Sequence, residues 1–376
     1  MENYDLDNFE PAAKIVVIGV GGAGNNAVNR MIDEDIANVE FYVANTDKQA
    51  LSTSKARHRI ILGQEITGGL GAGGEPEIGR QAAEASADDI REIVKDANMV
   101  FIAAGMGGGT GTGAAPVIAR IAKDCGALVI AIVTRPFTFE GKKRTVNSID
   151  GLNNLKNNVD SIIVVSNDKL LMVSGTAPIG SAFNESDKVL AQSVKTVVDL
   201  ILLPAVINLD FADVRNTLFE SGVALIGFGL GTGPNRSKDA AQSAINSPLL
   251  EASISGARRA IVAVTCGPQV TLYEAKSSVD RLIEASGHEI DIKFGIAIND
   301  QLTDEILVSV IATDFEHSID FSAVTPFNPI NEDKKETFVL QNDTPAPAVE
   351  VTPTPSVPSF DDDVSADDIL PSFLKD

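Results

Sequence analysis

The run Gly105–Gly113, Gly-Met-Gly-Gly-Gly-Thr-Gly-Thr-Gly, constrains the fold more than any other stretch of the chain. It follows an apolar, strand-like segment, Met99–Ala104, and precedes Ala114–Cys125, whose apolar residues recur at helical spacing. Glycines in such a turn let backbone N–H groups approach an anion, and the dipole of the following helix favours negative charge. The pattern therefore predicts a phosphate-binding loop, to which the hydroxyls of Thr110 and Thr112 add donors. A flexible linker is the alternative, but linkers do not usually join an apolar strand to an amphipathic helix.

Charge limits what such a loop can bind. The chain has no Walker-type Gly-Lys-Ser/Thr sequence, so backbone dipoles, hydroxyl groups and a metal ion must neutralise bound phosphates. Its formal net charge is −22 at pH 7, which makes a divalent cation the expected companion of a nucleotide. The same charge disfavours binding to nucleic acid and adsorption to anionic membranes. Three scattered histidines, His58, His288 and His317, argue against a histidine-rich metal site, and no metal-ligating residues are predicted.

Length and composition allow two globular domains, since 44% of the 376 residues are apolar. Cys125 and Cys266 fall in a predicted helix and a predicted strand and are expected to be reduced core residues. No signal peptide opens the chain, and no run of about 18 apolar residues could span a bilayer. We therefore expect a cytoplasmic protein without direct membrane insertion.

A second glycine motif, Gly19–Gly24, follows the apolar run Lys14–Val20, and a helix is expected to open at Asn25. The motif matches G-x-G-x-x-G after a strand, and Asp47 follows the next strand, Val39–Asn45, at about the interval of a dinucleotide-binding fold. Taken alone, this stretch supports an NAD-dependent oxidoreductase, which stays open as an alternative. Two glycine loops, one of them bearing threonines, favour a nucleoside polyphosphate instead.

Strand-like and helix-like segments alternate through the first half of the chain, which predicts a parallel, doubly wound α/β sheet. Further strands are expected at 59–62, 128–134 and 161–166, and helices at 75–96 and 142–157. The longest helical pattern, Phe183–Leu203, carries a broad apolar stripe that predicts burial between two bodies, and Pro204 ends it. A second α/β unit is expected to follow, with strands near 223–229, 260–265, 290–298 and 306–312 and helices near 237–246 and 272–285.

The ends of the chain differ from its body. Residues 317–364 hold seven of the 17 prolines and few aliphatic residues, a composition typical of a disordered linker. In the last segment, Ser365–Asp376, apolar residues return at i, i+1, i+4 and i+5 from Ile369, which predicts a short peptide that docks on a partner. A merely apolar terminus is the alternative. Residues 1–11 are acidic and polar and are expected to form a flexible arm.

Two pairs of residues could recognise the rest of a nucleotide. Glu140 and Arg144 lie shortly after a predicted strand, where they could bind ribose and phosphate; a surface ion pair is the alternative. Phe183 and Asp187 lie one turn apart at the start of the long helix. One carboxylate can accept both N1–H and N2–H of guanine, a pair that adenine lacks, and Phe183 could cover the base. An ordinary helix start with an acidic first turn is the alternative.

Asn208, Asp210 and Asp213 form an acidic loop after the long helix. Two carboxylates at i, i+3 can orient a water and stabilise a cation near phosphate, although an aspartate here is also a common helix N-cap. A helix about 30 Å long separates this loop from the nucleotide end. The loop could instead reach the γ-phosphate of a neighbour stacked head to tail, a heterologous contact that builds a filament.

Together these motifs resemble those of the tubulin and FtsZ family of GTPases, over about residues 14–315. The resemblance implies a tubulin-like fold, with a Rossmann-like GTP-binding domain at 12–178, a central helix at 179–203 and a C-terminal α/β domain at 204–316. The matching motifs occur in order: Gly21–Asn26, Asn45–Asp47, Gly69–Gly74, Gly105–Gly113, Phe139–Arg144, Asn167–Asp168, Phe183 with Asp187, and Asn208–Asp213.

By this resemblance, the chain binds GTP or GDP with Mg²⁺ and hydrolyses GTP within a head-to-tail homopolymer that builds the bacterial division ring. Asn208, Asp210 and Asp213 would complete hydrolysis on the adjacent subunit. The residues implied to contact nucleotide are Gly21, Gly22, Ala23, Gly24, Asn25, Asn26, Gly105, Gly108, Gly109, Thr110, Gly111, Glu140, Arg144, Asn167, Phe183 and Asp187.

The terminal peptide, Ser365–Asp376, is similar to the tail by which FtsZ proteins bind membrane tethers such as FtsA, which implies assembly under the inner membrane at the division site. It reads Asp-Ile-Leu-Pro-Ser-Phe-Leu-Lys where the family has Asp-Ile-Pro-x-Phe-Leu-Arg, so the identity of the tether stays open. Ala23 also stands where many relatives have glycine. A plasmid-partitioning tubulin-like filament is an alternative that the tail disfavours, and Asp210 and Asp213 argue against a non-hydrolysing scaffold.

Overall fold

The computed structural model describes residues 13–173, 179–202, 205–247, 249–250, 254, 256–286 and 290–315. The predicted arm, linker and docking peptide lie outside the described residues. The strands are β1 (Ile15–Val20), β2 (Glu40–Asn45), β3 (His58–Ile61), β4 (Met99–Gly105), β5 (Leu128–Arg135), β6 (Ser161–Ser166), β7 (Gly222–Gly231), β8 (Ala257–Cys266), β9 (Asp291–Ile298) and β10 (Ile306–Phe315). The α-helices are α1 (Gly21–Asp33), α2 (Lys48–Ser52), α3 (Gln64–Thr67), α4 (Pro76–Ala85), α5 (Ala87–Val94), α6 (Thr110–Asp124), α7 (Lys142–Lys156), α8 (Asn167–Val173), α9 (Ile179–Leu202), α10 (Phe211–Leu218), α11 (Arg236–Ile245) and α12 (Leu272–Ser286).

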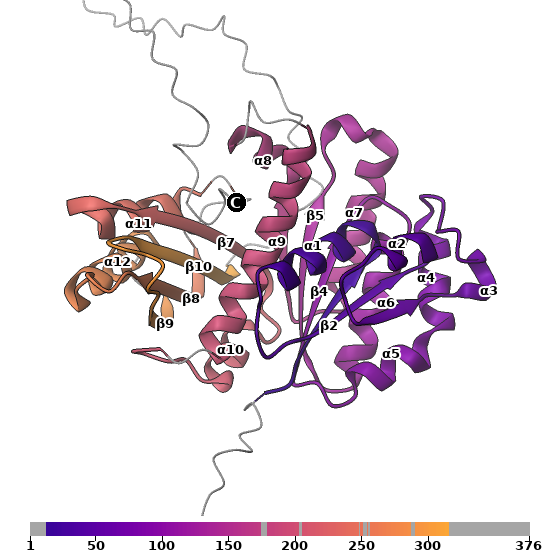
Figure 1. Ribbon diagram of the computed structural model, residues 1–376, viewed down its shortest axis with the longest axis horizontal. Coiled ribbons are helices and arrows are strands. Elements are labelled where there is room, and N and C mark those ends of the chain that lie inside the picture. Colours follow the sequence, from indigo (N-terminus) through magenta and orange to yellow (C-terminus); the bar gives the residue numbers. More distant parts are fainter. Residues whose placement is uncertain are drawn as a thin grey trace, which may run out of the picture.

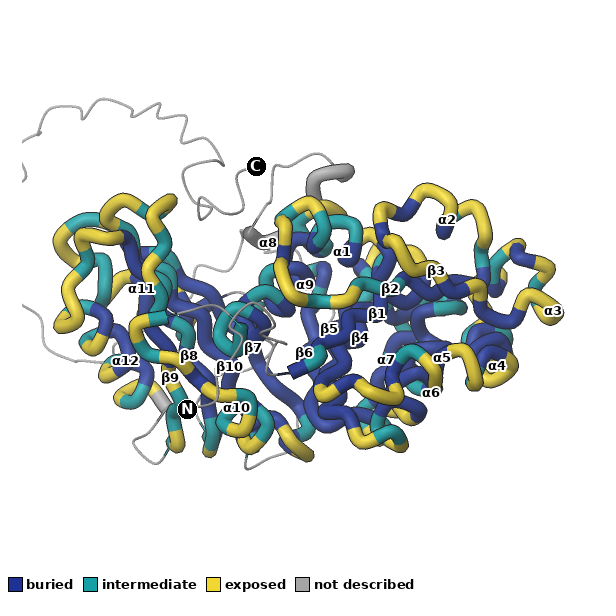
Figure 2. The backbone as a smooth tube through the Cα atoms, turned by 60° about the horizontal axis from the view of Figure 1, so that its bottom comes forward, coloured by how far each residue is buried: buried dark blue, intermediate teal, exposed yellow. Residues whose placement is uncertain are grey.

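The described strands form one continuous sheet in the order β3-β2-β1-β4-β5-β6-β7-β10-β8-β9 (Figure 1). Its first six strands are parallel, as the strand–helix alternation predicted. β1, β4 and β5 are buried along nearly their whole lengths (Figure 2). Helices cover both faces of these strands, and for that reason their sequences are continuously apolar instead of alternating.

Successive residues of a strand point to opposite faces of the sheet, and each face has its own core. Val16 and Ile18 of β1 pack in the core covered by α4, α5, α6 and α7. Ile15 and Val17 of the same strand pack in the core covered by α1 and α9. The parallel half is therefore a three-layer structure of helices, sheet and helices. Because its strands are parallel, all of them begin at one edge of the sheet and end at the other.

The C-terminal half joins the same sheet through β7, which pairs with β6 in parallel at Ser161↔Gly222, Ile162↔Val223 and Ile163↔Ala224. β10 then lies antiparallel between β7 and β8, while β9 pairs with β8 in parallel. The second α/β unit is thus confirmed as an element pattern, but its sheet is mixed. The backbone hydrogen bonds run without interruption from the first domain to the second.

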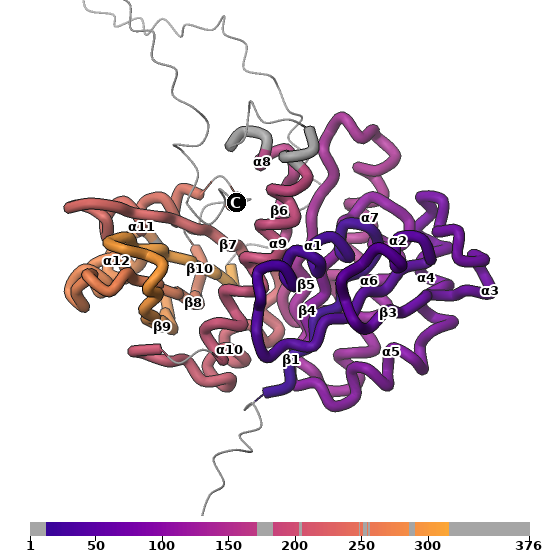
Figure 3. The backbone as a smooth tube through the Cα atoms, viewed as in Figure 1, coloured from indigo at the N-terminus to yellow at the C-terminus, as the bar shows by residue number. Residues whose placement is uncertain are grey.

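The long helix α9 lies between the two halves of the molecule (Figure 3). Its side chains Leu190, Val194 and Val197 are buried in one cluster with residues of β1, β4 and β5. The same cluster includes Ile226 of β7 and Ile311 of β10. The broad apolar stripe of α9 is therefore buried between the two halves of the molecule, as the sequence predicted, because the helix packs against strands of both halves.

Two helices begin earlier than the sequence predicted. α1 starts at Gly21 instead of Asn25, and α6 starts at Thr110 instead of Ala114. Low helix propensity of glycine led the prediction to place both glycine runs entirely in loops. In the structure the last glycines of each run form the first helical turn, where the N–H groups have no intrahelical partner and can face a ligand.

Other boundaries also differ from the prediction. The helix predicted at 75–96 is two helices, α4 and α5, because Ser86 leaves the helical conformation and its hydroxyl accepts the Gly63 N–H at 3.0 Å. The helices α8 and α10 were not predicted, since each is one or two turns long and has too few periodic positions. No helix within the described ranges has the length and apolar character needed to cross a bilayer.

Candidate functional site

A cavity of about 450 Å³ opens at the carboxyl edge of the parallel strands, where β1, β4 and β5 end. We call it the carboxyl-edge cavity. It gathers residues from segments far apart in sequence, as expected for a ligand site in an open α/β sheet. Its lining includes most of the nucleotide-contact residues predicted from sequence: Gly21, Gly22, Ala23, Asn26, Gly105, Gly108, Gly109, Thr110, Gly111, Glu140, Arg144, Asn167, Phe183 and Asp187.

The floor of the cavity is made by two helix N-termini that meet backbone to backbone. Gly21, at the start of α1, has φ +72°, and a Cβ on it would stand 2.9 Å from the amide nitrogen of Gly111. A Cβ on Gly111 would stand 2.5 Å from the carbonyl oxygen of Gly105. Glycine is required at both contacts, because a side chain on Gly21 would separate the two loops and one on Gly111 would push α6 away from the end of β4. The positive ends of α1 and α6 thus converge, which favours bound phosphate groups.

Thr110 and Thr112 have different positions, although the sequence predicted both as donors to phosphate. Thr110 lines the cavity, and its hydroxyl forms a hydrogen bond of 2.7 Å with the hydroxyl of Thr46. Thr112 is only 3% exposed and does not line the cavity. Its hydroxyl oxygen accepts the Gly107 N–H at 2.8 Å. The prediction that Thr112 contacts phosphate is therefore wrong for this structure, because the side chain supports the loop from behind.

Gly24 and Asn25 are also absent from the lining of the cavity. A Cβ on Gly24 would stand 2.2 Å from the carbonyl oxygen of Ala103, so this glycine allows α1 to approach β4. The Asn25 amide, in the orientation that satisfies both of its ends, donates to the carbonyl oxygens of Gly19 and Gly21 at 3.0 and 2.9 Å. Its oxygen accepts from the Asn45 amide. Both residues shape the loop and do not face the cavity.

Glu140 and Arg144 lie at the rim of the cavity and form an ion pair with each other. Glu140 is the better fixed of the two, since its other oxygen accepts the Phe137 N–H at 2.9 Å. The Arg144 side chain is 56% exposed. The Glu140–Arg144 ion pair, which the sequence offered as an alternative to nucleotide binding, therefore forms, and both of its residues line the cavity.

The opposite wall comes from α9 and from Asn167, the first residue of α8. Asn167 accepts a hydrogen bond of 2.9 Å from the Ser186 hydroxyl, which ties the start of α8 to α9. Burial raises the pKa of the Asp187 carboxyl to about 7, and the nearby Arg30 guanidinium offsets part of that rise. Phe183 is partly exposed and contacts the ring of Phe137 edge to face, with 5.0 Å between ring centroids. A half-desolvated carboxylate beside an aromatic face is a suitable receptor for an aromatic base with adjacent N–H donors.

Asn208, Asp210 and Asp213 do not contribute to this cavity. Asp210 is the N-cap of α10, and its carboxylate accepts the Asp213 N–H at 2.7 Å. α10 leads into β7, whose first residue pairs with the first residue of β6. The acidic loop therefore lies at the amino edge of the parallel strands (Figure 1). The helix α9, which has 24 residues and is about 36 Å long, separates it from the carboxyl edge. The strand pairing therefore agrees with the predicted separation of the acidic loop from the nucleotide end of the same subunit.

Several lining residues were missed from sequence: Val20, Met106, Thr134, Pro136 and Ser186. Val20 and Thr134 are at or near the carboxyl ends of β1 and β5, a position that the parallel-sheet prediction could have identified. Ser186 precedes Asp187 on α9 and carries no separate signal. No group of three metal-ligating side chains occurs among the residues that the structure describes.

Comparisons with known proteins agree with this arrangement. Residues 14–175 match the model for the Tubulin/FtsZ family, GTPase domain, and residues 222–316 match that for the FtsZ family, C-terminal domain. An empty FtsZ dimer from M. jannaschii is 42% identical in sequence, with a TM-score of 0.79, over 82% of this chain and 90% of that one. GDP-bound monomeric CetZ1 and GTPγS-bound protofilament CetZ2, both from Haloferax volcanii, share the fold at 21% and 22% identity.

The two CetZ structures have TM-scores of 0.72 and 0.70 and are each matched over 82% of this chain, covering 96% and 95% of theirs. At such identities they support the fold alone. The M. jannaschii FtsZ is far more similar and is matched along nearly its whole length. From these matches and the two family models, the chain belongs to the FtsZ family of tubulin-like GTPases.

Proposed function

We propose that this chain binds GTP in the carboxyl-edge cavity and hydrolyses it within head-to-tail filaments, where the acidic loop of one subunit completes the site of the next. The observation that supports this most is the position of the two functional elements. The cavity and the loop of Asn208, Asp210 and Asp213 lie at opposite edges of one sheet. A subunit with its two half-sites at opposite ends acts fully only when it is stacked on a copy of itself.

Guanine selection is assigned to Asp187, whose carboxylate can accept both N1–H and N2–H of the base. Phe183 covers the base, while Glu140 and Arg144 contact ribose and phosphate at the rim. The phosphates occupy the floor, where the N-termini of α1 and α6 converge. Mg²⁺ is expected to bind with the phosphates and to neutralise charge that builds up on them during hydrolysis. The protein offers no lysine in the phosphate loop to do this.

In the assembled site, the carboxylates of Asp210 and Asp213 would face the γ-phosphate of the neighbouring subunit. Asp210 is fixed by its own N-cap hydrogen bond, so its position needs little reorganisation on assembly. A fixed carboxylate can hold an attacking water by accepting its hydrogen bond and can draw off a proton as the bond to phosphorus forms. Asn208 would add a polar contact to the same water.

Exposed apolar side chains support an interface at each end. Phe139, which precedes the rim residue Glu140, is 66% exposed, and Leu70 is 88% exposed in the segment whose Ala72 lies against Gly109. At the other end, Val206 follows α9 and Phe219 follows α10, and both are also exposed. Large exposed apolar groups usually mark interaction sites when they cluster at a functional edge. Two such edges on one subunit suit an open-ended, heterologous contact.

The cellular role is proposed from the resemblance of the tail. Ser365–Asp376 would dock on a membrane tether such as FtsA, and the linker at 317–364 would let it reach the inner membrane from a cytoplasmic filament at the division site. This assigns the protein to the division ring. Docking through a peptide also requires no insertion of the protein into the bilayer.

Phosphate release from GTP, measured against protein concentration, tests the proposal. Shared sites predict almost no turnover below a threshold concentration and a steep rise above it. Turnover strictly proportional to protein concentration from the lowest point would support a self-contained enzyme and would overturn catalysis between subunits. Parallel binding measurements with GTP, ATP and NAD test nucleotide choice, for which we expect GTP alone to bind tightly.

A further inference from the structure

The phosphate loop contains a turn at Gly107 whose backbone groups are not hydrogen-bonded within the sheet. Gly107 has φ +110°, a conformation that other residues adopt rarely, and a Cβ on it would stand 2.8 Å from the carbonyl oxygen of Arg144. The turn connects the end of β4 to Gly108 and Gly109, which line the cavity. Its backbone N–H and C=O take no part in the β4 ladder. Side chains must therefore satisfy them if the loop is to keep one shape.

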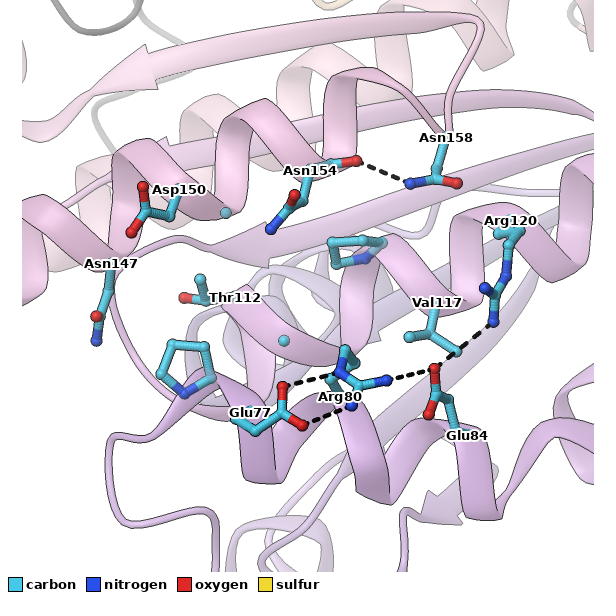
Figure 4. A pocket seen from close by; sticks show the side chains of 14 residues that line it. Glu77, Arg80, Glu84, Thr112, Val117, Arg120, Asn147, Asp150, Asn154 and Asn158 are labelled. Carbon is cyan, nitrogen blue, oxygen red and sulfur yellow. Dashed lines mark hydrogen bonds and ion pairs between the residues drawn. The ribbon is translucent and has the colours of Figure 1, made fainter.

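Two side chains do so from behind the loop. The Thr112 hydroxyl on α6 accepts the Gly107 N–H at 2.8 Å. The Asn147 amide on α7 donates to the Gly107 carbonyl oxygen at 3.4 Å and to that of Gly74 at 3.3 Å. Both residues line a separate groove of about 370 Å³ between α4, α6 and α7, and Figure 4 shows them near one another at one end of it. The groove shares no lining residue with the carboxyl-edge cavity.

The position of Thr112 is itself fixed by a close helix contact. A Cβ on Gly151 of α7 would stand 2.4 Å from the Thr112 Cγ2 and 3.3 Å from the Met106 sulfur. α7 can approach α6 this closely only because residue 151 is glycine. The methyl group of Thr112 is thereby held against α7, which leaves its hydroxyl directed at the turn.

We infer that Thr112 and Asn147 are positioning residues for nucleotide phosphate, which act through the Gly107 turn without touching the ligand. This rests on the proposed binding of GTP in the carboxyl-edge cavity. With the turn fixed, the N–H groups of the phosphate loop are already aimed at the cavity before a nucleotide arrives. Without it, part of the binding free energy is consumed in ordering the loop.

Replacing Thr112 by valine tests the inference, because valine keeps the shape of the side chain and removes only the hydroxyl. The buried Gly107 N–H then has no acceptor, and we expect the full-length Thr112→Val protein to bind GTP about tenfold more weakly than wild type. Thr112→Ser keeps the hydroxyl and should restore most of the affinity. Base recognition at Asp187 is untouched, so the ratio of GTP to ITP affinity should stay at the wild-type value.

Thr196→Val is a matched control. Thr196 is a nearly buried helical threonine on α9, and its hydroxyl donates to the Gln192 carbonyl oxygen, away from the loop. It should bind GTP as wild type does. Wild-type affinity in Thr112→Val, or equal losses in Thr112→Ser and Thr112→Val, would overturn the inference. If wild type itself failed to bind GTP, the proposed function would fail instead.

Asn147→Ala supplies a second test should Thr112→Val not fold. Asn147 lies at a partly exposed position, so its removal leaves the core intact. The loss of its two long hydrogen bonds should weaken GTP binding about threefold, with the ratio of GTP to ITP affinity again unchanged. Wild-type GTP affinity in a folded Asn147→Ala protein would overturn the positioning role of Asn147 whether or not Thr112→Val folds.

Discussion

Gly21 and Gly111 lie backbone against backbone, so close that a Cβ on Gly21 would stand 2.9 Å from the Gly111 amide nitrogen. Gly21 opens α1 and Gly111 is in the first turn of α6. This contact brings two helix N-termini to one place and makes a single anion site from two separate glycine motifs. The first motif, although it has the dinucleotide-binding spacing, is thus one part of a cavity that the second glycine loop also lines.

Gly111→Ala should therefore damage both stability and nucleotide binding. Its Cβ would stand 2.5 Å from the Gly105 carbonyl oxygen, a backbone atom that cannot move without β4. We expect a loss of at least about 2 kcal/mol in the free energy of unfolding, measured by urea denaturation without nucleotide. Gly108→Ala is the control, since no atom lies within 4 Å of its Cβ position and its φ is not positive. It should unfold within about 0.5 kcal/mol of wild type; equal losses in both variants would contradict this packing argument.

The sequence was sufficient for the fold of the parallel half, because β1, β4 and β5 are continuously apolar and each leads into a turn signal. It was also sufficient to bring most of the cavity together, since parallel strands end at one edge. It did not separate Thr110 from Thr112, two residues apart in the same motif. Their roles depend on which side of α6 each one faces, and that is decided by the contact of Thr112 with Gly151.

The mixed sheet of the C-terminal half could not be predicted either. Its strands have the same apolar character whether β10 runs parallel or antiparallel, so direction depends on long-range pairing with β7 and β8. The N-cap role of Asp210 was recognised as an alternative to the catalytic role. The structure has the cap, which holds the Asp210 carboxylate in a fixed position.

GTP binding should depend on pH through Asp187. Burial raises the pKa of this carboxyl to about 7, so near pH 6 most of the free protein carries it protonated, and a protonated carboxyl accepts poorly from guanine. Affinity for GTP should therefore fall as pH decreases from 8 to 6, approaching tenfold per unit at the lower end. Isothermal titration calorimetry at pH 6, 7 and 8 measures this, and Asp187→Asn should bind weakly with little pH dependence over that range.

The same group predicts an effect on stability without nucleotide. A carboxyl whose pKa is raised by folding stabilises the protein when it is protonated, and this contribution is lost as pH rises through the folded-state value near 7. Asp187→Asn removes the charge, so its melting temperature should exceed that of wild type at pH 8, and the difference should shrink as pH falls from 7 toward the unfolded-state value of 3.8. A lower melting temperature than wild type at pH 8 would show that Asp187 is paired in the free protein.

Tether docking should be separable from assembly. Phe373→Ala removes the largest apolar side chain of Ser365–Asp376, and short docking peptides concentrate their affinity in one or two apolar anchors. Capture on vesicles coated with the tether should be lost, while pelleting of GTP-dependent filaments without vesicles stays at the wild-type level. A protein ending at Phe315 should also pellet with GTP, and loss of its filaments would contradict this division of labour.

The central claim, catalysis between subunits, calls for a variant that changes charge without disturbing the helix. Asp210→Ala would remove the N-cap of α10 as well as the carboxylate, at a cost of about 1 kcal/mol. Asp210→Asn is better because asparagine caps helices equally well. It should bind GTP with wild-type affinity, form filaments that persist, and lose most of its turnover, because the neighbour's γ-phosphate no longer faces that carboxylate.

The most direct test mixes Asp210→Asn with Arg144→Ala, whose defect lies in its own carboxyl-edge cavity. Co-assembly is first confirmed by pelleting differently labelled chains, and phosphate release is then measured on the same sample. An interface that joins the intact cavity of the Asp210→Asn chain to the intact acidic loop of the Arg144→Ala chain contains every catalytic group. We predict turnover above the sum of the two separate activities, and co-assembly with no such gain would contradict catalysis between subunits.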